Sequence, residues 1–281
     1  MKKILVTGAN GQLGKCIKDA SLNFPDFEFD FKTREELNIE DESSVRDYFS
    51  KNKLDYCINA AAYTNVEKAE SEPDKAFAVN AEAVKNIAIA CKNQNVVLIH
   101  ISTDYVFNGE KQIPYTEDDK TNPINVYGAS KLKGEQIIQE TLNDYFILRT
   151  SWLYSQYGHN FYNSIVKFAT QGKELSITTE QTGTPTNANN LANSILNIIA
   201  INSKKFGIYN FSNTGEATWY DFAKVIMQQT KQFDPTKLAK TDHYRTFAKR
   251  PKNSVLNTLK FKNTFNKELI NWEKSLSMLI K

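Results

Sequence analysis

The chain has 281 residues, of which 41% are hydrophobic, including 17 Phe and 13 Tyr, so it can bury a sizeable core and is not expected to be disordered. Its net charge is +3, without a basic or acidic block, which excludes a nucleic-acid footprint and a charged membrane-binding patch. No apolar run approaches the roughly 18–20 residues of a membrane span, and three cysteines without a Cys-x-x-Cys pair favour reduced packing residues in a cytoplasmic protein.

Over the first 150 residues, short apolar segments alternate with amphipathic ones. The expected strands are rich in β-branched and aromatic residues and span 3–7, 27–31, 56–59, 96–102 and 145–150. The expected helices span 12–20, 43–52, 74–93 and 126–142. Runs such as Val96-Val97-Leu98-Ile99 do not alternate with polar residues, which indicates burial on both faces of a sheet. The pattern predicts an α/β fold with a doubly wound, Rossmann-like parallel sheet.

A glycine-rich turn, Gly8-x-x-Gly11-x-x-Gly14, follows the first expected strand and opens the first expected helix. Glycines allow a tight turn and a close approach to a pyrophosphate, and the free N–H groups of a helix start favour its negative charge. The turn therefore predicts a dinucleotide cofactor.

The preference between NADPH and NADH is left open by the second expected strand. Asp30 lies 22 residues after Gly8, where a carboxylate can bind a ribose 2′-hydroxyl and favour NAD. Lys32 and Arg34 follow closely and suit a 2′-phosphate instead. We expect use of both cofactors, with a slight preference for NADPH.

A tyrosine and a lysine with proton-transfer spacing lie at the start of the fourth expected helix. Tyr127 and Lys131 are four residues apart, so they share one helix face. A nearby ammonium stabilises a phenolate, so we expect Lys131 to lower the pKa of Tyr127 and suit it to proton exchange. Thr103, at the end of the fourth expected strand, can hydrogen-bond a substrate carbonyl beside Tyr127. His100 is expected to be a core residue, and no histidine pair has metal-ligand spacing, so no metal is expected.

After residue 150 the pattern changes to longer loops rich in Asn, Thr and Gln. Helices are expected at 160–171, 189–202, 218–229 and 271–280, and strands near 175–178 and 207–211. We expect a dinucleotide-binding Rossmann domain over residues 1–150 and a smaller α/β substrate-binding region over 151–281, sharing one core with the first.

Several longer sequence blocks point to one protein family. The chain resembles the extended short-chain dehydrogenase/reductases and, among them, the dTDP-4-dehydrorhamnose reductases. The matching blocks cover most of the chain in order; they are Gly8–Gly14, Asn59-Ala60-Ala61-Ala62-Tyr63-Thr64, Lys68-Ala69-Glu70-Ser71-Glu72-Pro73, Ser102–Phe107, Asn125–Lys131, Arg149-Thr150-Ser151-Trp152-Leu153-Tyr154, Pro185-Thr186 and Arg250-Pro251-x-x-Ser254.

The resemblance implies hydride transfer from NADPH or NADH to the C4 ketone of a dTDP-6-deoxy-sugar, in dTDP-rhamnose biosynthesis. Tyr127 would protonate the alkoxide, Lys131 would tune Tyr127 and hold the nicotinamide ribose, and Thr103 would polarise the ketone. The implied cofactor contacts are Gly8, Gly11, Gln12, Leu13, Asp30, Asn38, Ile39, Ala62, Tyr63, Thr64, Tyr127 and Lys131. Asn38 departs from the family pattern, which usually has Asp there. The implied substrate contacts are Thr103, Asp104, Tyr105, Trp152, Val66, Asn160 and Arg250.

Two alternatives remain open at this point. The first is a related sugar-nucleotide 4,6-dehydratase or epimerase; the dehydratases carry Asp-Glu after the threonine, whereas this chain has Asp104-Tyr105. The second is a non-catalytic regulatory binding subunit of the same fold, which need not keep the Tyr, Lys and Thr set that this chain retains. The resemblance also allows a homodimer.

Overall fold

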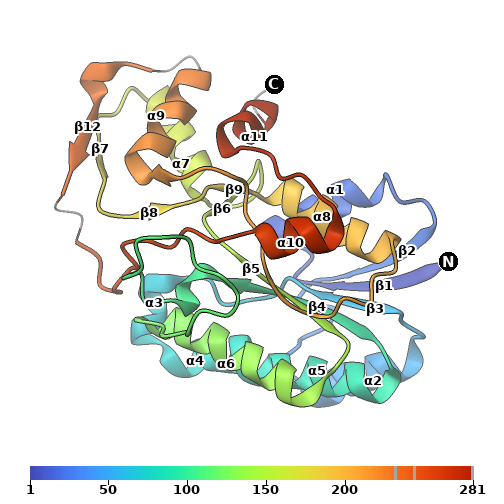
Figure 1. Ribbon diagram of the computed structural model, residues 1–281. Coiled ribbons are helices and arrows are strands. Elements are labelled where there is room, and N and C mark those ends of the chain that lie inside the picture. Colours follow the sequence, from blue (N-terminus) through green and yellow to red (C-terminus); the bar gives the residue numbers. More distant parts are fainter. Residues whose placement is uncertain (231–232, 243–244, 280–281) are drawn as a thin grey trace.

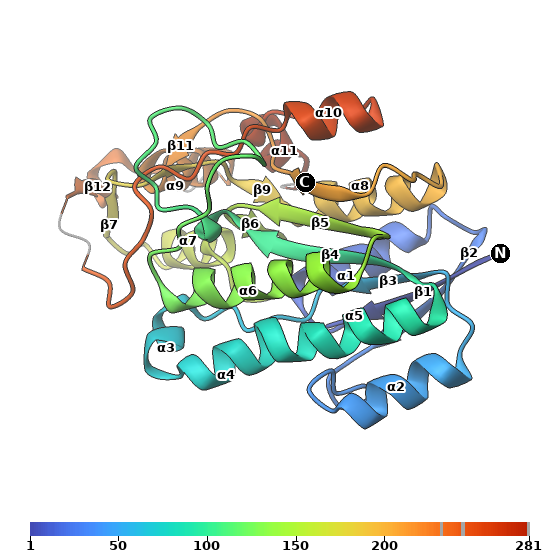
Figure 2. The same ribbon diagram turned by 60° about the horizontal axis from the view of Figure 1, so that its bottom comes forward.

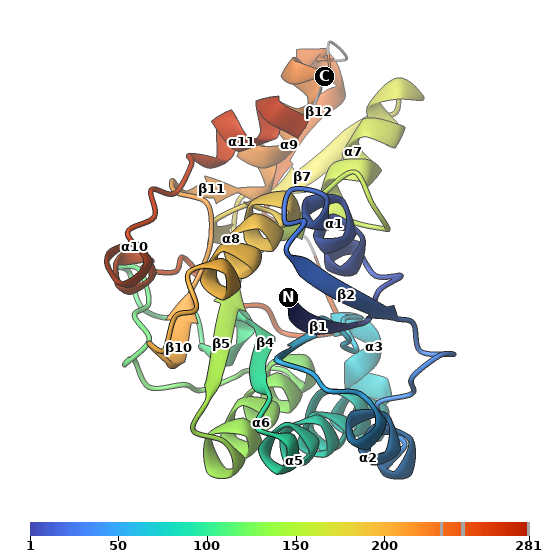
Figure 3. The same ribbon diagram turned by 90° about the vertical axis from the view of Figure 1, so that its right-hand side faces the viewer.

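The computed structural model describes residues 1–230, 233–242 and 245–279. At its centre is a six-stranded parallel sheet in the order β10-β5-β4-β3-β1-β2, with helices on both faces (Figures 1 and 3). The strands are β1 (Lys2–Thr7), β2 (Phe27–Lys32), β3 (Tyr56–Asn59), β4 (Val97–Thr103), β5 (Tyr145–Thr150) and β10 (Gly207–Asn210). The predicted doubly wound α/β fold is confirmed.

Each central strand supplies apolar side chains to both faces of the sheet. In β1, Ile4 and Val6 belong to the core cluster on one face and Leu5 to the cluster on the other. Val97 and Leu98 of β4 divide in the same way. This arrangement explains the unbroken apolar runs, because successive side chains of a strand point to opposite faces.

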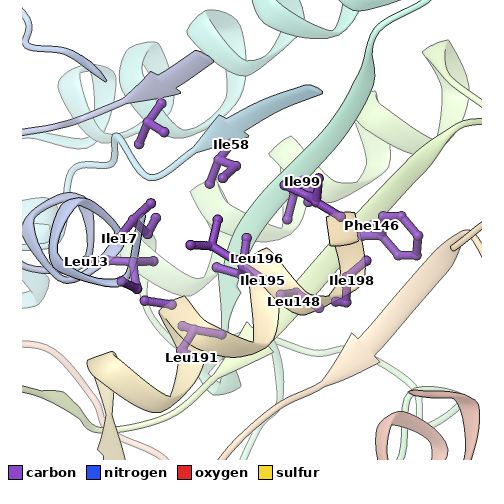
Figure 4. Packing of buried hydrophobic residues seen from close by; sticks show 14 of the residues in the cluster. Leu13, Ile17, Ile58, Ile99, Phe146, Leu148, Leu191, Ile195, Leu196 and Ile198 are labelled. Atoms are coloured by element: carbon purple, nitrogen blue, oxygen red, sulfur yellow. The ribbon is translucent and has the colours of Figure 1, made fainter. Parts of the chain in front are cut away.

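Helices α1 (Gln12–Ser21) and α8 (Ala188–Ala200) cover one face. Figure 4 shows Leu13 and Ile17 of α1 close to Leu191 and Ile195 of α8 and to the sheet residue Ile58. The opposite face is covered by α2 (Glu42–Lys51), α5 (Ala83–Gln94) and α6 (Val126–Thr141), which lie side by side beneath the sheet in Figure 2.

The long helix expected over 74–93 is interrupted. It consists of α4 (Pro73–Phe77), a π-helical turn η1 (Ala78–Glu82) and α5. In this turn the Asn80 Nδ2 donates to the Ser130 Oγ of α6 at 3.0 Å and to the Tyr63 carbonyl at 2.9 Å. A π-helical turn often marks a functional position, and here it ties α6 to the segment after β3.

The second region forms a smaller lobe with its own aromatic core (Figure 1). The predicted helices correspond to α7 (Phe161–Thr170), α8, α9 (Trp219–Gln229) and α11 (Trp272–Leu279), and the predicted strands to β7 (Leu175–Thr178) and β10. Residue Ile280 of the predicted last helix lies outside the described residues. Elements that were not predicted are α3 (Val66–Ser71), the 3-10 turns η2 (Asp104–Val106) and η3 (Pro235–Lys237), α10 (Leu259–Phe265), and the short strands β6 (Leu153–Tyr154), β8 (Thr182–Gly183), β9 (Thr186–Asn187), β11 (Ala217–Thr218) and β12 (Leu238–Thr241).

The two regions are joined through the main sheet. Strand β10 pairs with β5, and α8 packs on α1, so residues after 150 complete the core of the first region. The division at residue 150 therefore stays a prediction about the roles of the two parts. Within the described part of the chain, no helix combines the length and apolar character that crossing a membrane requires.

Candidate active site

The carboxyl ends of β1, β3, β4 and β5 meet at one edge of the sheet and line a cavity of about 450 Å³. The chain order reverses there, because β1 has β2 on one side and β3 on the other. Such a switch point is where ligands bind in doubly wound sheets. The second region closes the cavity from the other side with residues from β6, α7 and α9.

The glycine turn forms the floor under one end of the cavity. Gly8 has φ +69°, and a Cβ on it would lie 2.7 Å from the Ala61 backbone nitrogen, so a side chain does not fit. Gly11 is the N-cap residue of α1 and offers no side-chain hydrogen bond, which leaves N–H groups of the first helical turn free for a ligand. Gly11, Gln12 and Leu13 line the cavity. This cradle fits the pyrophosphate of a dinucleotide.

Thr103 ends β4 and brings a hydroxyl into the cavity. Its Oγ1 donates to the Asp104 Oδ1 at 3.0 Å and accepts from the Tyr105 backbone N–H at 3.2 Å. Asp104 is buried, and burial raises the pKa of its carboxyl to about 6. The carboxylate therefore sits near its titration range at neutral pH.

Tyr127 reaches the same place from the first turn of α6. Asn125 caps that helix by accepting from the Gly128 N–H at 2.7 Å. A Cβ on Gly128 would lie 2.2 Å from the Tyr105 carbonyl oxygen, so glycine permits α6 to pack directly against η2. This contact holds Tyr127 beside Thr103, whose hydroxyl interacts with the phenol.

The pKa of Tyr127 differs from the sequence-based expectation. Burial raises it to about 12, opposed by the hydrogen bond with Thr103 and reinforced by the Asp104 charge. The expected lowering by Lys131 is therefore not seen in the protein alone, where burial dominates and the groups that act on the phenol are Thr103 and Asp104. A protonated phenol is the form that a reduction requires, since it must give up its proton to a forming alkoxide.

Lys131 is buried one turn further along α6. Its Nζ donates to the Ile101 carbonyl at 2.7 Å and lies 3.2 Å from the His100 Nε2. Burial lowers the pKa of Lys131 to about 8, and the charge of Glu135 opposes that shift. His100 is buried as predicted, and its imidazole faces Lys131 instead of only filling the core.

The opposite wall of the cavity is aromatic. The rings of Trp152 and Trp219 stack at 3.5 Å with an interplanar angle of 4°, and Phe161 lies 4.6 Å from Trp219. Trp152 holds the unusual φ of +46° for a residue other than glycine, and Gly183 leaves room for its ring, since a Cβ there would lie 2.5 Å from it. A strained residue fixed in this way is typical of a binding site.

Asn160 and Arg250 connect this wall to the rest of the cavity. Asn160 caps α7 and donates to the Gln12 Oε1 at 2.6 Å, which links the second region to the start of α1. Arg250 lines the cavity while its Nη2 bonds to the Glu67 Oε1 at 2.7 Å, next to Val66 at the start of α3.

The structure brings most of the predicted site residues together. Those that line the cavity are Gly11, Gln12, Leu13, Ala62, Thr64, Val66, Thr103, Asp104, Tyr105, Tyr127, Lys131, Trp152, Asn160 and Arg250. Their individual roles stay predictions.

Five predicted cofactor residues lie outside the cavity lining. Gly8 shapes the turn beneath it, and Tyr63 turns its hydroxyl to the Glu72 Oε2 at 2.9 Å. Asp30 accepts from the Tyr48 hydroxyl and pairs with Lys32 at 3.0 Å. Asn38 bonds the Glu40 N–H, and Ile39 is buried in the core. In this structure, intramolecular partners occupy Asp30 and Asn38.

Other residues of the lining were not predicted as contacts, although several lie inside the matching sequence blocks. They are Asn59, Ala60, Ala61, Ile101, Ser102, Thr150, Ser151, Leu153, Tyr154, His159, Phe161 and Trp219. Phe161 and Trp219 carried no local signal, because each begins an ordinary amphipathic helix and reaches the cavity only through the tertiary fold.

Buried hydroxyls in the lining support a polar ligand. Among the described residues, Ser102 Oγ and Thr150 Oγ1 have no hydrogen-bond partner. Buried polar atoms are normally satisfied, so these two are suited to bonding polar atoms of a bound cofactor or substrate.

Comparison with known proteins agrees with this geometry. The family model described as "RmlD substrate binding domain" matches residues 1–281. The chain is 38% identical over 287 residues to a dTDP-4-dehydrorhamnose reductase of Sinorhizobium fredii, covering 99% of this chain and 96% of the relative. The dTDP-4-dehydrorhamnose reductase of Bacillus anthracis in complex with NADP superimposes with a TM-score of 0.93 at 35% identity, covering 99% of both chains.

A second solved structure gives the same result. The dTDP-4-dehydrorhamnose reductase of Clostridium acetobutylicum superimposes with a TM-score of 0.92 at 36% identity, covering 99% of this chain and 98% of the other. These similarities extend over the whole chain, and the polar and aromatic walls of the cavity fall within them. The protein therefore belongs to the dTDP-4-dehydrorhamnose reductase family.

Proposed function

We propose that the protein reduces the C4 ketone of dTDP-4-dehydro-L-rhamnose to dTDP-L-rhamnose with NADPH, in the biosynthesis of this nucleotide sugar. The observation that carries the proposal is the convergence of Tyr127, Lys131 and Thr103 on one cavity that also contains the glycine turn. When bound, the cofactor supplies the hydride. The residues of this chain supply the cradle, the proton and the orientation of the ketone.

In this proposal Thr103 hydrogen-bonds the ketone oxygen and so favours charge developing on it. Tyr127 donates its proton to that oxygen as the alkoxide forms. Lys131, as an ammonium, stabilises the phenolate that remains on Tyr127. Thr103 and Lys131 are buried and Tyr127 is half-buried, which limits the water around them and strengthens each of these interactions.

The remaining walls are assigned to the two ligands. The free N–H groups after Gly11 hold the cofactor pyrophosphate, and Lys32 and Arg34 at the end of β2 favour a 2′-phosphate. The aromatic wall, with Asp104 and Asn160, holds the sugar and its nucleotide, and Arg250 meets the diphosphate. We infer the same functional division near residue 150: proton transfer and cofactor binding before it, substrate selection after it.

The dehydratase alternative is disfavoured by one residue. The position after Asp104 is Tyr105, a buried phenol whose pKa is raised by burial, and not a second carboxylate that could remove a proton from C5. The three free, buried cysteines support a reaction in the reducing cytoplasm.

The test is stoichiometry combined with product identification. The purified protein is mixed with dTDP-4-dehydro-L-rhamnose and NADPH, and we expect one NADPH to be oxidised per sugar, with dTDP-L-rhamnose as the product. A dehydratase or epimerase would transform its sugar without net NADPH consumption, and a binding subunit would consume neither; either result would contradict the proposal.

A further inference from the structure

A buried chain of polar side chains runs from β1 to the proposed catalytic lysine. It consists of Thr7, Asn59, His100 and Lys131, each at most 2% exposed. The Thr7 Oγ1 bonds the Asn59 Oδ1 at 2.7 Å, the Asn59 Nδ2 faces the His100 Nδ1 at 3.1 Å, and the His100 Nε2 faces the Lys131 Nζ at 3.2 Å. The proposed reaction uses only the last of these four residues.

The orientation of the Asn59 side chain follows from a backbone contact. The Ala61 N–H, which can only donate, points at the Asn59 Oδ1 at 3.3 Å, so the carbonyl of the amide must be on that side. The amide nitrogen then faces His100 and donates to its Nδ1. A neutral imidazole that accepts at Nδ1 must carry its proton on Nε2.

That tautomer has a consequence for Lys131. The Nε2 proton points at the lysine Nζ, which can accept it only as an uncharged amine, since an ammonium has no lone pair. The amine still donates to the Ile101 carbonyl at 2.7 Å. As built, the chain of bonds therefore matches neutral Lys131 and opposes the ammonium.

We propose that His100, held by Asn59, is a positioning residue that sets the charge on Lys131 through the tautomer of its imidazole. When Lys131 takes up one proton from solvent, the imidazole stays neutral but moves its own proton from Nε2 to Nδ1. Its Nε2 then accepts from the ammonium. Asn59 must turn its amide to receive the Nδ1 proton and gives up the bond from the Ala61 N–H.

The other charged groups near this pair act in known directions. Glu135 of α6 favours the ammonium, and it is held by Arg149 of β5 through bonds of 2.7–3.2 Å. Asp104 at the end of β4 acts on Tyr127. Burial lowers the pKa of His100 well below its usual range, and the charge of Lys131 lowers it further, which keeps the imidazole neutral. The charge on Lys131 is therefore coupled to the tautomer of a neutral His100 imidazole, and no imidazolium is involved.

The proposed coupling between His100 and Lys131 does not depend on the proposed function, but its expected effect on the pH dependence of activity does. The ammonium is the form that stabilises the Tyr127 phenolate, so activity should fall as the pH rises through about 8, the pKa of Lys131. His100→Gln can turn a carbonyl oxygen to the ammonium, and Asn59→Asp holds the imidazole proton on Nδ1. Both changes favour the ammonium and should move the alkaline fall in kcat/KM upward by about one pH unit or more.

The direct test uses the cofactor-free protein and needs no substrate. The chain contains three histidines, so the ¹⁵N-imidazole signals of His100 in histidine-labelled protein can be assigned by their loss in His100→Gln. We expect the proton on Nε2 at pH 10 and on Nδ1 at pH 6, and on Nδ1 throughout in Asn59→Asp. A single tautomer across the range in the wild-type protein would overturn the proposal, whether or not the protein reduces the expected sugar.

The second test is the pH profile of kcat/KM for each variant. Each profile is scaled to its own maximum, so that a variant that is only less stable does not show a shifted midpoint. Asn193→Asp makes the same chemical change as Asn59→Asp at an exposed amide of α8 that does not line the cavity, and its alkaline midpoint should stay where it is in the wild type. If His100→Gln and Asn59→Asp lose rate equally at every pH, with unshifted midpoints, His100 has a structural role only and the proposal is wrong.

Discussion

The two walls of the cavity differ in the kind of side chain that forms them. The wall formed by strand ends and α6 is polar and deeply buried, and its groups are placed by hydrogen bonds such as Lys131 to Ile101. The wall from the second region is a stack of rings, with Trp152 and Trp219 3.5 Å apart. Directional bonds position reacting atoms, whereas flat apolar faces select shape and area. The difference predicts that changes in the first wall alter kcat and changes in the second alter KM.

The largest expected effect is at Tyr127. Tyr127→Phe removes the proton donor while keeping the ring, so kcat should fall by about 10²–10⁴-fold and the Kd for NADPH should stay near that of the wild type. Steady-state kinetics and cofactor titration measure the two. Tyr209→Phe is the matched control, because that hydroxyl bonds the Lys205 carbonyl away from the cavity. Unchanged turnover in Tyr127→Phe would contradict the role of proton donor that is proposed for Tyr127 in the polar wall.

The next effect is at Lys131. Lys131→Met should lower kcat by about 10²-fold and also weaken NADPH binding, because the ammonium stabilises the phenolate and is expected to hold the ribose. Lys133→Met changes an exposed residue of the same helix and should alter neither quantity. If the NADPH affinity of Lys131→Met equals that of the wild type while its rate falls, the lysine tunes Tyr127 without holding the cofactor.

The polar wall was largely predictable from sequence, and the aromatic wall was not. Tyr127 and Lys131 are four residues apart, and Thr103 ends a strand, so local rules place them at one edge of a parallel sheet. Phe161 and Trp219 come from two helices of the second region and meet only after the lobe folds. Trp152 was named from family resemblance, and its stacking partner had no signal of its own.

Asp30 shows a second limit of prediction from sequence, which concerns where a residue lies within its strand. The segment Phe27–Lys32 alternates phenylalanine with charged residues, so Asp30 shares a face with Lys32 and turns to Tyr48 of α2. Asp30 pairs with Leu5 in the sheet, whereas Lys32 pairs with Thr7 at the strand end. Distance along the chain suggested a ribose contact, and the strand register sets the acid back from the strand end; the contact stays a prediction.

A moderate effect is expected at the aromatic wall. Trp219→Ala removes one face of the ring stack, so the KM for the nucleotide sugar should rise about 10-fold with kcat changing far less. Tyr220→Ala removes an aromatic ring from the same turn of α9 that does not line the cavity, and it should leave KM unaltered. If Trp219→Ala lowers kcat and leaves KM constant, the aromatic wall does not act through substrate binding, and the proposed difference between the two walls is contradicted.

The smallest effect concerns cofactor choice. Arg34 follows β2, is 66% exposed and pairs with Glu40 at 2.6 Å. Its charge can turn to a 2′-phosphate, so Arg34→Gln should reduce the preference for NADPH over NADH by about 10-fold or less. Arg46→Gln, which removes a similarly exposed charge from α2, should not change the ratio. Equal losses with NADPH and NADH would show that Arg34 does not read the 2′-phosphate.

Isotope transfer tests the central claim most directly. NADPH carrying deuterium at the transferable C4 position is incubated with dTDP-4-dehydro-L-rhamnose and wild-type protein, and the product is examined by NMR. Reduction beside Tyr127 predicts deuterium at C4 of the sugar, in an amount equal to the NADPH oxidised. A transformed sugar without deuterium at C4 would contradict reduction by the added cofactor.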